Sequence, residues 1–201
     1  MPIIDLSPIR TRSFFWKIWR TNFVNGARAA GIRGSLSWYG ISDWQLDPWK
    51  TANSPYIKAP GARPAGLGVL VYPPWPGATL YDGLISSVRW EATRMGLEDV
   101  EYFTMLLDRL STLRELCALP CGNTSANACH PNGVLLSAER ALNRVDEVVW
   151  GWAGCTWVET PPRRWNITEP YTMNTSLVHD VLGTVAFEIE KADRALDGFD
   201  R

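Results

Sequence analysis

The feature that most constrains the fold of this 201-residue chain is a long amphipathic pattern from about Ser86 to Leu116. Apolar residues recur in it at helical intervals, which places their side chains on one face of an α-helix. The residues of this stripe are Val88, Ala92, Met95, Phe103, Leu106, Leu110 and Leu113. The pattern predicts one long helix. Because a helix in a protein gains most of its stability from packing, other elements must cover the stripe.

The first half of this pattern is also rich in charge, and several of the charges are three or four positions apart. Opposite charges at this spacing face each other on a helix. Asp99 falls on the apolar stripe, and because a buried carboxylate needs a partner, we expect Arg94 or Arg89 to pair with it or with its neighbours. Gly96 costs about 1 kcal/mol relative to Ala in a helix interior, and the expected compensation is the close approach of another backbone. We interpret the charged set as a structural ion network, formed by Arg89, Glu91, Arg94, Glu98 and Asp99.

The chain before this helix predicts one further helix and two strands. A helix is expected over residues 14–30, closed by Gly31, with an apolar stripe formed by Phe15, Ile18, Trp19, Phe23 and Ala27. Residues 35–38 alternate as in a strand, and residues 67–72 are continuously apolar, as in a strand buried on both faces. Residues 40–65 and 73–86 show no periodicity and are predicted to be loops.

Two more helices are predicted after residue 116. The first covers residues 137–150, with Ala138, Leu142, Val145 and Val149 directed inward. The second covers residues 175–196, with one apolar side made of Val178, Leu182, Val185, Ile189 and Ala192. Residues 117–133 and 151–174 are expected to be irregular. We therefore divide the chain into a part of mixed structure, residues 1–116, and a Cys-containing loop with a helical extension, residues 117–201.

Composition and charge exclude several classes of function. The net charge of −1 offers no attraction for nucleic acid or an anionic membrane, so neither is expected as a partner. No apolar run approaches the roughly 18 residues of a transmembrane helix, and the first residues do not resemble a secretory signal. His130 and His179 are the only histidines, and neither has a convincing partner for metal binding or for a Ser-His-Asp triad. There is no Gly-rich phosphate loop, so we expect no cofactor and no metal.

Cysteines and glycosylation sequons favour an oxidising environment. The four cysteines are Cys117, Cys121, Cys129 and Cys155, and the sequons begin at Asn123, Asn166 and Asn174. An even number of cysteines beside several sequons predicts disulfides, N-linked glycans and a secreted or lumenal location, with the missing signal peptide suggesting that the true N-terminus is absent. Four free thiols in a cytosolic chain remain the alternative. A zinc site is a weaker one, because the cysteines lack paired C-x2-C spacing.

Several segments in the first half of the chain resemble glycoside hydrolase family 123 and its uncharacterised relatives. The matching segments are Arg12-x-x-x-Trp16-x-x-Trp19, Gly34-x-Leu36-x-Trp38, Asp47-Pro48-Trp49, Gly68-Val69-Leu70-Val71-Tyr72-Pro73 and Arg89-x-Glu91-Ala92-x-Arg94-x-Gly96-Leu97-Glu98-Asp99-x-Glu101-Tyr102. The last departs from the usual pattern, with Trp90 where the family has Leu and Met95 where it has Asp. The match runs from about Ile4 to Leu110.

The resemblance implies an α/β fold: the C-terminal fragment of a (β/α)8 TIM barrel, with about two parallel strands plus helices, followed by the mainly helical extension. It also implies hydrolysis of O-glycosidic bonds of the β-N-acetylgalactosaminidase kind, in which the acetamido group of the substrate attacks its own anomeric carbon. The family's catalytic Asp-Glu pair is expected in a barrel segment upstream of Met1. Asp146-Glu147 lies in a predicted helix, and so does Glu98-Asp99, so we assign no catalytic residue.

In α/β barrels the loops after the strands build the active site. The chain contains 11 Trp residues, and aromatic rings near such loops offer flat faces on which sugar rings stack, although large aromatics also fill cores. The candidate sugar-binding residues are Trp38, Tyr39, Asp43, Trp44, Asp47, Trp49 and Tyr72. The expected partner is a glycan containing an N-acetylhexosamine. A non-catalytic carbohydrate-binding or scaffold module is the alternative, followed by a small helical secreted module.

Overall fold

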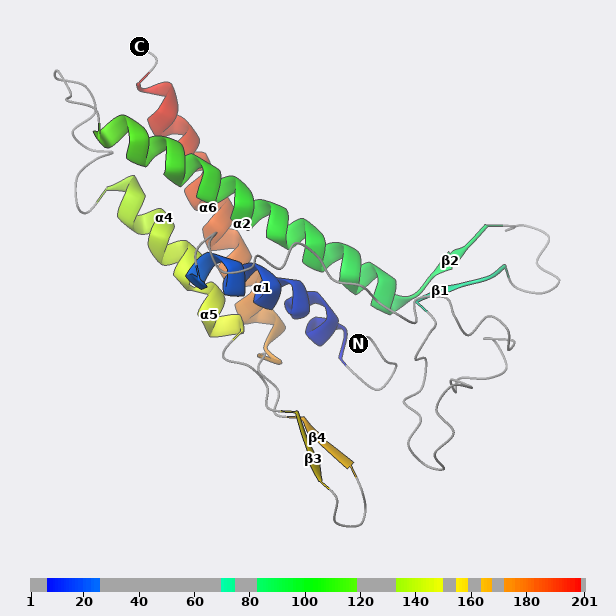
Figure 1. Ribbon diagram of the computed structural model, residues 1–201. Helices are drawn as coiled ribbons and strands as arrows, with labels where there is room; N and C mark the ends of the chain where they lie inside the picture. Colours follow the sequence, from blue (N-terminus) through cyan, green and yellow to red (C-terminus); the bar gives the residue numbers. More distant parts are fainter. Residues whose placement is uncertain are drawn as a thin grey trace. The chain divides into compact units, whose positions relative to one another are not determined.

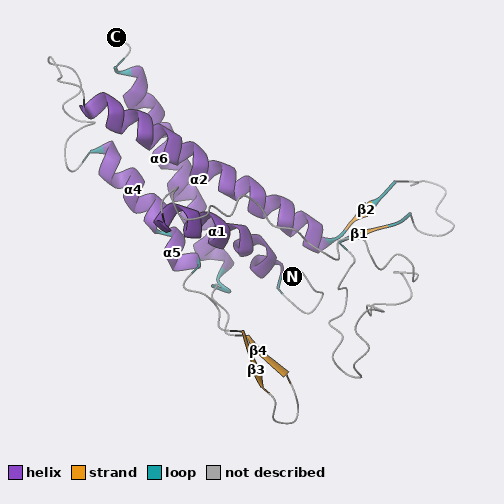
Figure 2. Ribbon diagram, in the orientation of Figure 1, coloured by secondary structure: helices purple, strands orange, loops and turns teal. Residues whose placement is uncertain are grey.

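The computed structural model describes residues 7–25, 70–74, 83–118, 133–149, 155–158, 164–167 and 172–199. These residues are mostly helical, with short antiparallel strands (Figure 2). The helices are α1 (Pro8–Asn25), α2 (Val88–Ala118), α4 (Val134–Asn143), α5 (Val145–Val148) and α6 (Thr175–Asp197), labelled in Figure 1. The chain forms two compact units, one of Met1–Leu97 with Trp152–Pro170 and the other of Glu98–Gly151 with Tyr171–Arg201.

The strands form two small antiparallel sheets. In the first, β1 (Val71–Tyr72) pairs with β2 (Ile85–Ser86), placing Val71 opposite Ser86 and Tyr72 opposite Ile85. In the second, β3 (Cys155–Val158) pairs with β4 (Arg164–Ile167). The predicted pairing of two parallel strands is not found among the described residues, and the expected strand 35–38 lies outside them. The described residues are mainly helical with small antiparallel sheets, so they agree only loosely with the expected α/β class, and no barrel lies among them.

Two predicted loops contain strands, so these predictions were wrong. β2 lies at the end of the stretch 73–86, and the β3–β4 hairpin lies within the stretch 151–174. The segments Cys155–Val158 and Arg164–Ile167 carry the β-branched and aromatic residues that favour strands. At four residues each they are too short for an alternating pattern to stand out.

α1 begins at Pro8, six residues before the predicted start at 14. Ser7 and Pro8 form a common helix start, because serine favours the N-cap and proline tolerates the first helical position. The buried face of α1 is centred on Ile9, Ser13 and Trp16. Of the stripe predicted for this helix, Trp19 is buried as expected, Phe15 and Ile18 are half-buried, and Gly31 lies outside the described residues.

α2 has nearly the predicted bounds, but its buried stripe differs in the first half. Val88 and Met95, which were expected to be buried, are exposed. The buried stripe is Arg89, Ala92, Gly96, Asp99, Phe103, Leu106, Leu110 and Leu113, at alternating intervals of three and four. This is a heptad repeat with a mean period of 3.5 residues. At these two positions the predicted stripe was wrong by one residue. Val88 and Met95 are apolar, but the buried positions beside them are occupied by Arg89 and Gly96, which do not contribute to a hydrophobic pattern.

The predicted close approach at Gly96 is confirmed. A Cβ atom at this position would lie 2.5 Å from the carbonyl oxygen of Arg12 and 2.9 Å from the ring of Phe15. Both neighbours belong to α1. Glycine at position 96 therefore allows the backbone of α1 to reach the surface of α2, which offsets the helix propensity that glycine loses relative to alanine.

In the second unit, α4 packs along α6. The helix predicted over 137–150 starts three residues earlier, at Val134, and is divided at Arg144, which separates α4 from α5. All four residues expected to face inward are buried: Ala138, Leu142, Val145 and Val149. Ion pairs join α2 to both neighbours, from Arg109 to Asp193 of α6 and from Arg114 to Glu139 of α4.

α6 also has nearly the predicted bounds, and its buried stripe again follows intervals of three and four. The buried positions are Val178, Val181, Val185, Glu188 and Ala192, with Ile189 beside them. The predicted stripe placed Leu182 inward, but this residue is only half-buried, whereas Val181 and Glu188 are buried and were missed. Glu188 was missed because a charged residue does not contribute to a hydrophobic pattern.

Candidate functional site at the β1–α2 junction

The candidate site is the junction at which β1, β2 and the first turn of α2 meet. Tyr72 is the one predicted sugar-binding residue that lies within the described part of the chain, at the end of β1. The other candidates lie outside the described residues: Trp38, Tyr39, Asp43, Trp44, Asp47 and Trp49. Tyr72 is half-buried, so part of its surface can contact a ligand.

Ser87 connects this sheet to the helix. Its hydroxyl donates a hydrogen bond to the carbonyl oxygen of Leu70, next to β1. The hydroxyl oxygen of Ser87 also accepts a hydrogen bond from the backbone N–H of Trp90, at 3.1 Å, in the first turn of α2. Such a contact satisfies a donor that has no partner within the helix. Sequence reasoning missed Ser87, although a serine directly before a helical pattern is a common N-cap signal.

Arg89 reaches from α2 to β1. Its Nη2 atom donates a hydrogen bond to the hydroxyl oxygen of Tyr72 at 3.3 Å, and the Arg89 side chain is buried. A guanidinium group has only donors, so in this bond the phenol oxygen is the acceptor. The contact fixes the position of the Tyr72 ring relative to the start of α2, and Ser87 fixes the strand to the same turn.

Of the five residues predicted as one ion network, Glu91 and Arg94 form a hydrogen-bonded ion pair, and the network as a whole stays a prediction. Arg94 donates from Nε to an Oε2 of Glu91 at 2.9 Å, and both side chains are largely exposed. This hydrogen bond from Arg94, followed by one from Ser86, lowers the pKa of Glu91. Asp99 is buried as predicted, while Glu98 is exposed. The Glu91–Arg94 pair thus matches the helical spacing, whereas Arg89 faces the strand.

A second polar cluster lies between α4 and α6. The hydroxyl of Ser137 is 2.6 Å from Oε2 of Glu188 and accepts a hydrogen bond from Nζ of Lys191 at 2.8 Å. Lys191 also contacts both carboxylate oxygens of Glu188 at 3.0 Å. Since the lysine donates to the serine and is held by a carboxylate, it is not arranged to remove the serine proton. The cluster is therefore a satisfied, partly buried ion pair rather than a nucleophilic site.

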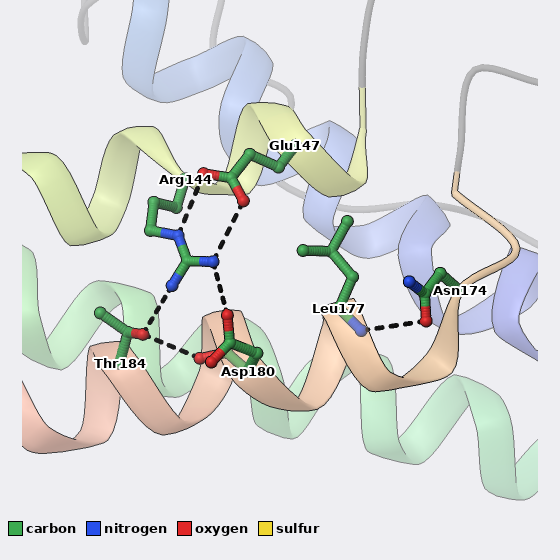
Figure 3. Close-up of polar contacts among 6 residues, drawn as sticks. All are labelled: Arg144, Glu147, Asn174, Leu177, Asp180 and Thr184. Carbon is green, nitrogen blue, oxygen red and sulfur yellow. Dashed lines mark hydrogen bonds and ion pairs between the residues drawn. The ribbon is translucent and has the colours of Figure 1, made fainter.

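A third cluster, shown in Figure 3, centres on Arg144 at the break between α4 and α5. Its guanidinium donates two hydrogen bonds to Glu147, at 3.0 and 3.1 Å, and reaches Asp180 at 2.6 Å and Thr184 at 2.8 Å on α6. The hydrogen bonds with Glu147 and then with Asp180 raise the pKa of Arg144 above its ordinary value. These contacts use all three nitrogen atoms of the guanidinium group and join α5 to α6, so the cluster has a structural role.

Neither adjacent carboxylate pair is arranged for the catalysis that the resemblance implies. Asp146 and Glu147 are both exposed on α5, and Glu147 is bound to Arg144. Glu98 and Asp99 lie in the middle of α2, one exposed and one buried. Among the described residues, no group of three or more His, Cys, Asp or Glu side chains could hold a metal ion. Within the same ranges, no helix is long and apolar enough to cross a membrane.

The predicted modification sites are partly described. Cys117 lies at the end of α2 and Cys155 begins β3, while Cys121 and Cys129 lie outside the described residues. Asn166 lies in β4, opposite Thr156, and Asn174 is the N-cap of α6. Asn123 and His130 lie outside the described residues, and His179 is exposed on α6. The disulfide pairing and the glycosylation stay predictions.

None of the protein-family models, curated proteins or solved structures compared with the chain matches it. The resemblance to glycoside hydrolase family 123 therefore depends on the quoted segments alone.

Proposed function

We propose that this chain is the C-terminal part of a protein similar to glycoside hydrolase family 123, which hydrolyses O-glycosidic bonds of N-acetylhexosamine-containing glycans. The observation that carries the proposal is the junction of Tyr72, Ser87 and Arg89. In the proposed (β/α)8 barrel, β1 is one of the last strands and α2 is the closing helix. A tyrosine at the end of a strand, held by a buried arginine, is suitably placed to contact a ligand bound at the carboxyl ends of the strands.

Each part of the junction has a role in this proposal. The ring of Tyr72 provides an apolar face for the C–H face of a sugar. Arg89 limits the rotation of the ring by binding its hydroxyl oxygen. Ser87 fixes the start of α2 to the residue before β1 through its hydrogen bonds with Trp90 and Leu70. Binding sites gain affinity when their groups are held in place before the ligand arrives.

The proposed reaction is substrate-assisted. The acetamido oxygen attacks the anomeric carbon, a carboxylate orients the amide, and a neighbouring carboxylic acid protonates the leaving oxygen. The surroundings of Asp146-Glu147 and Glu98-Asp99 do not suit these roles. We therefore assign both carboxylates to a longer parent protein and assign sugar contact, not proton transfer, to this chain.

A non-catalytic carbohydrate-binding module is the second candidate. It is favoured by the placement of the carboxylates. Tyr72 is held in position, whereas Glu147 is bound to Arg144 and the Glu98-Asp99 pair lies in the middle of α2. Both candidates share a glycan partner and a secreted or lumenal location. They differ in turnover: the binding module would bind N-acetylgalactosaminides and leave them intact, alone or within a longer protein.

Two measurements test the proposal. The first is release of nitrophenol from 4-nitrophenyl N-acetyl-β-D-galactosaminide by a full-length parent, where no turnover removes the enzyme and leaves the binding module. The second is calorimetric binding of N-acetylgalactosamine-terminated oligosaccharides to this chain. We expect Tyr72→Ala to weaken binding about tenfold or more, consistent with loss of an aromatic contact. Tyr102→Ala is the matched control, since Tyr102 is exposed on α2. Equal affinities for the two variants would remove Tyr72 from the site.

A further inference from the structure

We propose that Asn174 carries an N-linked glycan and caps α6 at the same time, with different atoms of one side chain serving the two roles. The inference rests on the secretory location that forms part of the proposed function. The sequon is Asn174-Thr175-Ser176, and all three residues are exposed. Exposure and the sequon make Asn174 a candidate acceptor, and the hydrogen bonds around it show which atom remains available.

The amide oxygen of Asn174 is used by the helix. Oδ1 accepts hydrogen bonds from the backbone N–H of Ser176 at 3.0 Å and of Leu177 at 3.3 Å, as Figure 3 shows for Leu177. These N–H groups have no partner within a helix, so the contact is a true N-cap. The backbone N–H of Asn174 donates to Oγ1 of Thr172 at 3.1 Å, and the N–H of Thr172 donates to the carbonyl oxygen of Val148 at 2.8 Å.

The amide nitrogen of Asn174 takes no part in the cap. Within the described part of the chain, Nδ2 has no hydrogen-bond partner, because the bonds of this residue use its backbone N–H, its backbone carbonyl oxygen or Oδ1. In N-glycosylation, Nδ2 attacks the anomeric carbon of an oligosaccharide carried on a polyprenyl diphosphate. An N–C bond forms, the C–O bond to the diphosphate breaks, the polyprenyl diphosphate leaves, and Nδ2 gives up one of its two protons to a base of the transferase. Oδ1 keeps its lone pairs and continues to accept both hydrogen bonds.

Asn174 is the sequon for which the structure makes this argument. Asn123 lies outside the described residues. Asn166 lies in β4 with its backbone opposite Thr156. A glycan at Asn174 would stand at the exposed end of α6, next to Met173, which is 59% exposed.

The test uses the whole chain, secreted from a eukaryotic host behind a cleavable leader. The wild-type chain and three variants are compared by gel mobility before and after treatment with peptide N-glycosidase F. Ser176→Ala destroys the sequon and leaves the cap, because the cap uses the backbone N–H of residue 176. Asn174→Asp also keeps a capping oxygen and removes the acceptor nitrogen. Asn174→Ala removes both.

We expect the bands of Ser176→Ala and Asn174→Asp each to lack the mobility shift of one glycan. In the wild-type chain, the peptide containing residue 174 should show the conversion of Asn to Asp that peptide N-glycosidase F causes. Equal mobility of wild type and Ser176→Ala would overturn the proposal. Thermal melting tests the dual role. The melting temperature of the glycosylated wild type should equal those of Ser176→Ala and Asn174→Asp and should be higher than that of Asn174→Ala. A glycosylated wild type that melts with Asn174→Ala would show that the glycan displaces the cap. None of these readouts depends on sugar cleavage, so they fail or succeed separately from the proposed hydrolase.

Discussion

The two halves of α2 bury the same helical face with different kinds of side chain. In the first half the buried stripe consists of Arg89, Ala92, Gly96 and Asp99, and in the second half it consists of Phe103, Leu106, Leu110 and Leu113. The heptad spacing continues unchanged through both. Spacing therefore determines which face of the helix is covered, whereas side-chain chemistry determines what covers it: a neighbouring backbone at Gly96, and an apolar core around Leu110.

The comparison has a physical explanation. A stripe of small and charged residues contributes little apolar area, so its stability comes from close backbone contact and from specific hydrogen bonds such as Arg89 to Tyr72. A stripe of Phe and Leu contributes stability through the removal of apolar area from water, about 25 cal/mol per Å². The first arrangement depends on geometry and the second on volume, and substitutions can separate these two requirements.

The largest effect is expected in the apolar half. Leu110 is fully buried, so Leu110→Ala removes buried methyl groups and leaves a cavity, at a cost of about 2–5 kcal/mol in the free energy of unfolding. Met105→Ala is the control on the same helix, because Met105 is 39% exposed, and its expected effect is within about 0.5 kcal/mol. Urea unfolding followed by circular dichroism measures both. Similar losses for the two variants would contradict the assigned face of α2.

The next largest effect tests whether the second unit tolerates a buried charge. Lys191→Met leaves the buried carboxylate of Glu188 without its cation, which should cost about 1–3 kcal/mol. The matched control on α6 is Arg194→Met, whose ion pair with Glu190 spans 3.7 Å and is exposed on both sides. The expected cost there is about 0–1 kcal/mol. The same urea unfolding assay compares the two, and a larger loss for Arg194→Met would show that the Ser137–Glu188–Lys191 cluster adds no stability.

A pair of glycines gives effects of opposite sign. Gly96→Ala gains about 1 kcal/mol of helix propensity, but its Cβ would lie 2.5 Å from a backbone oxygen of α1, and overpacking costs about 1–3 kcal/mol. A Cβ atom added at Gly183, on α6, would meet no atom within 4 Å. We therefore expect Gly96→Ala to lower the melting temperature and to increase hydrogen exchange in α1, and Gly183→Ala to raise the melting temperature. Stabilisation by both substitutions would mean that α1 does not approach α2 at Gly96.

Gly96 also illustrates what the sequence could predict. Its cost in a helix interior indicated a compensating backbone contact, and periodicity located α2, α4 and α6 to within a few residues. The buried positions of Arg89 and Glu188 were not predictable from hydrophobicity, because a heptad stripe does not require apolar residues at every position. Val88 and Met95 were misplaced for the same reason. The strands β2, β3 and β4 have two to four residues, too few for a periodic signal.

The candidate site was predicted less completely than the helices. Tyr72 was expected at the end of a strand, and it lies there with its hydroxyl bound by Arg89. Ser87 was missed although its position before the helix is a recognisable signal. The contact between Arg89 and Tyr72 joins residues that are 17 positions apart, which no local pattern indicates. The six other sugar-binding candidates lie outside the described residues and stay predictions.

The smallest effect concerns the exposed charges of the first half of α2, and its direction depends on pH. Hydrogen bonds from Arg94 and then from Ser86 lower the pKa of Glu91 in the folded chain. A group with a lowered folded pKa stabilises the fold at pH values above its ordinary pKa, and this contribution is lost as the pH falls through the lower folded value. The stability difference between wild type and Glu91→Gln should therefore be small and constant near neutral pH and should disappear in acid. Urea midpoints measured for both proteins across this range test the prediction. A difference that grows on acidification would have the wrong sign for a carboxylate held by Arg94, and would move the stabilising role in this half of the helix entirely to its buried stripe.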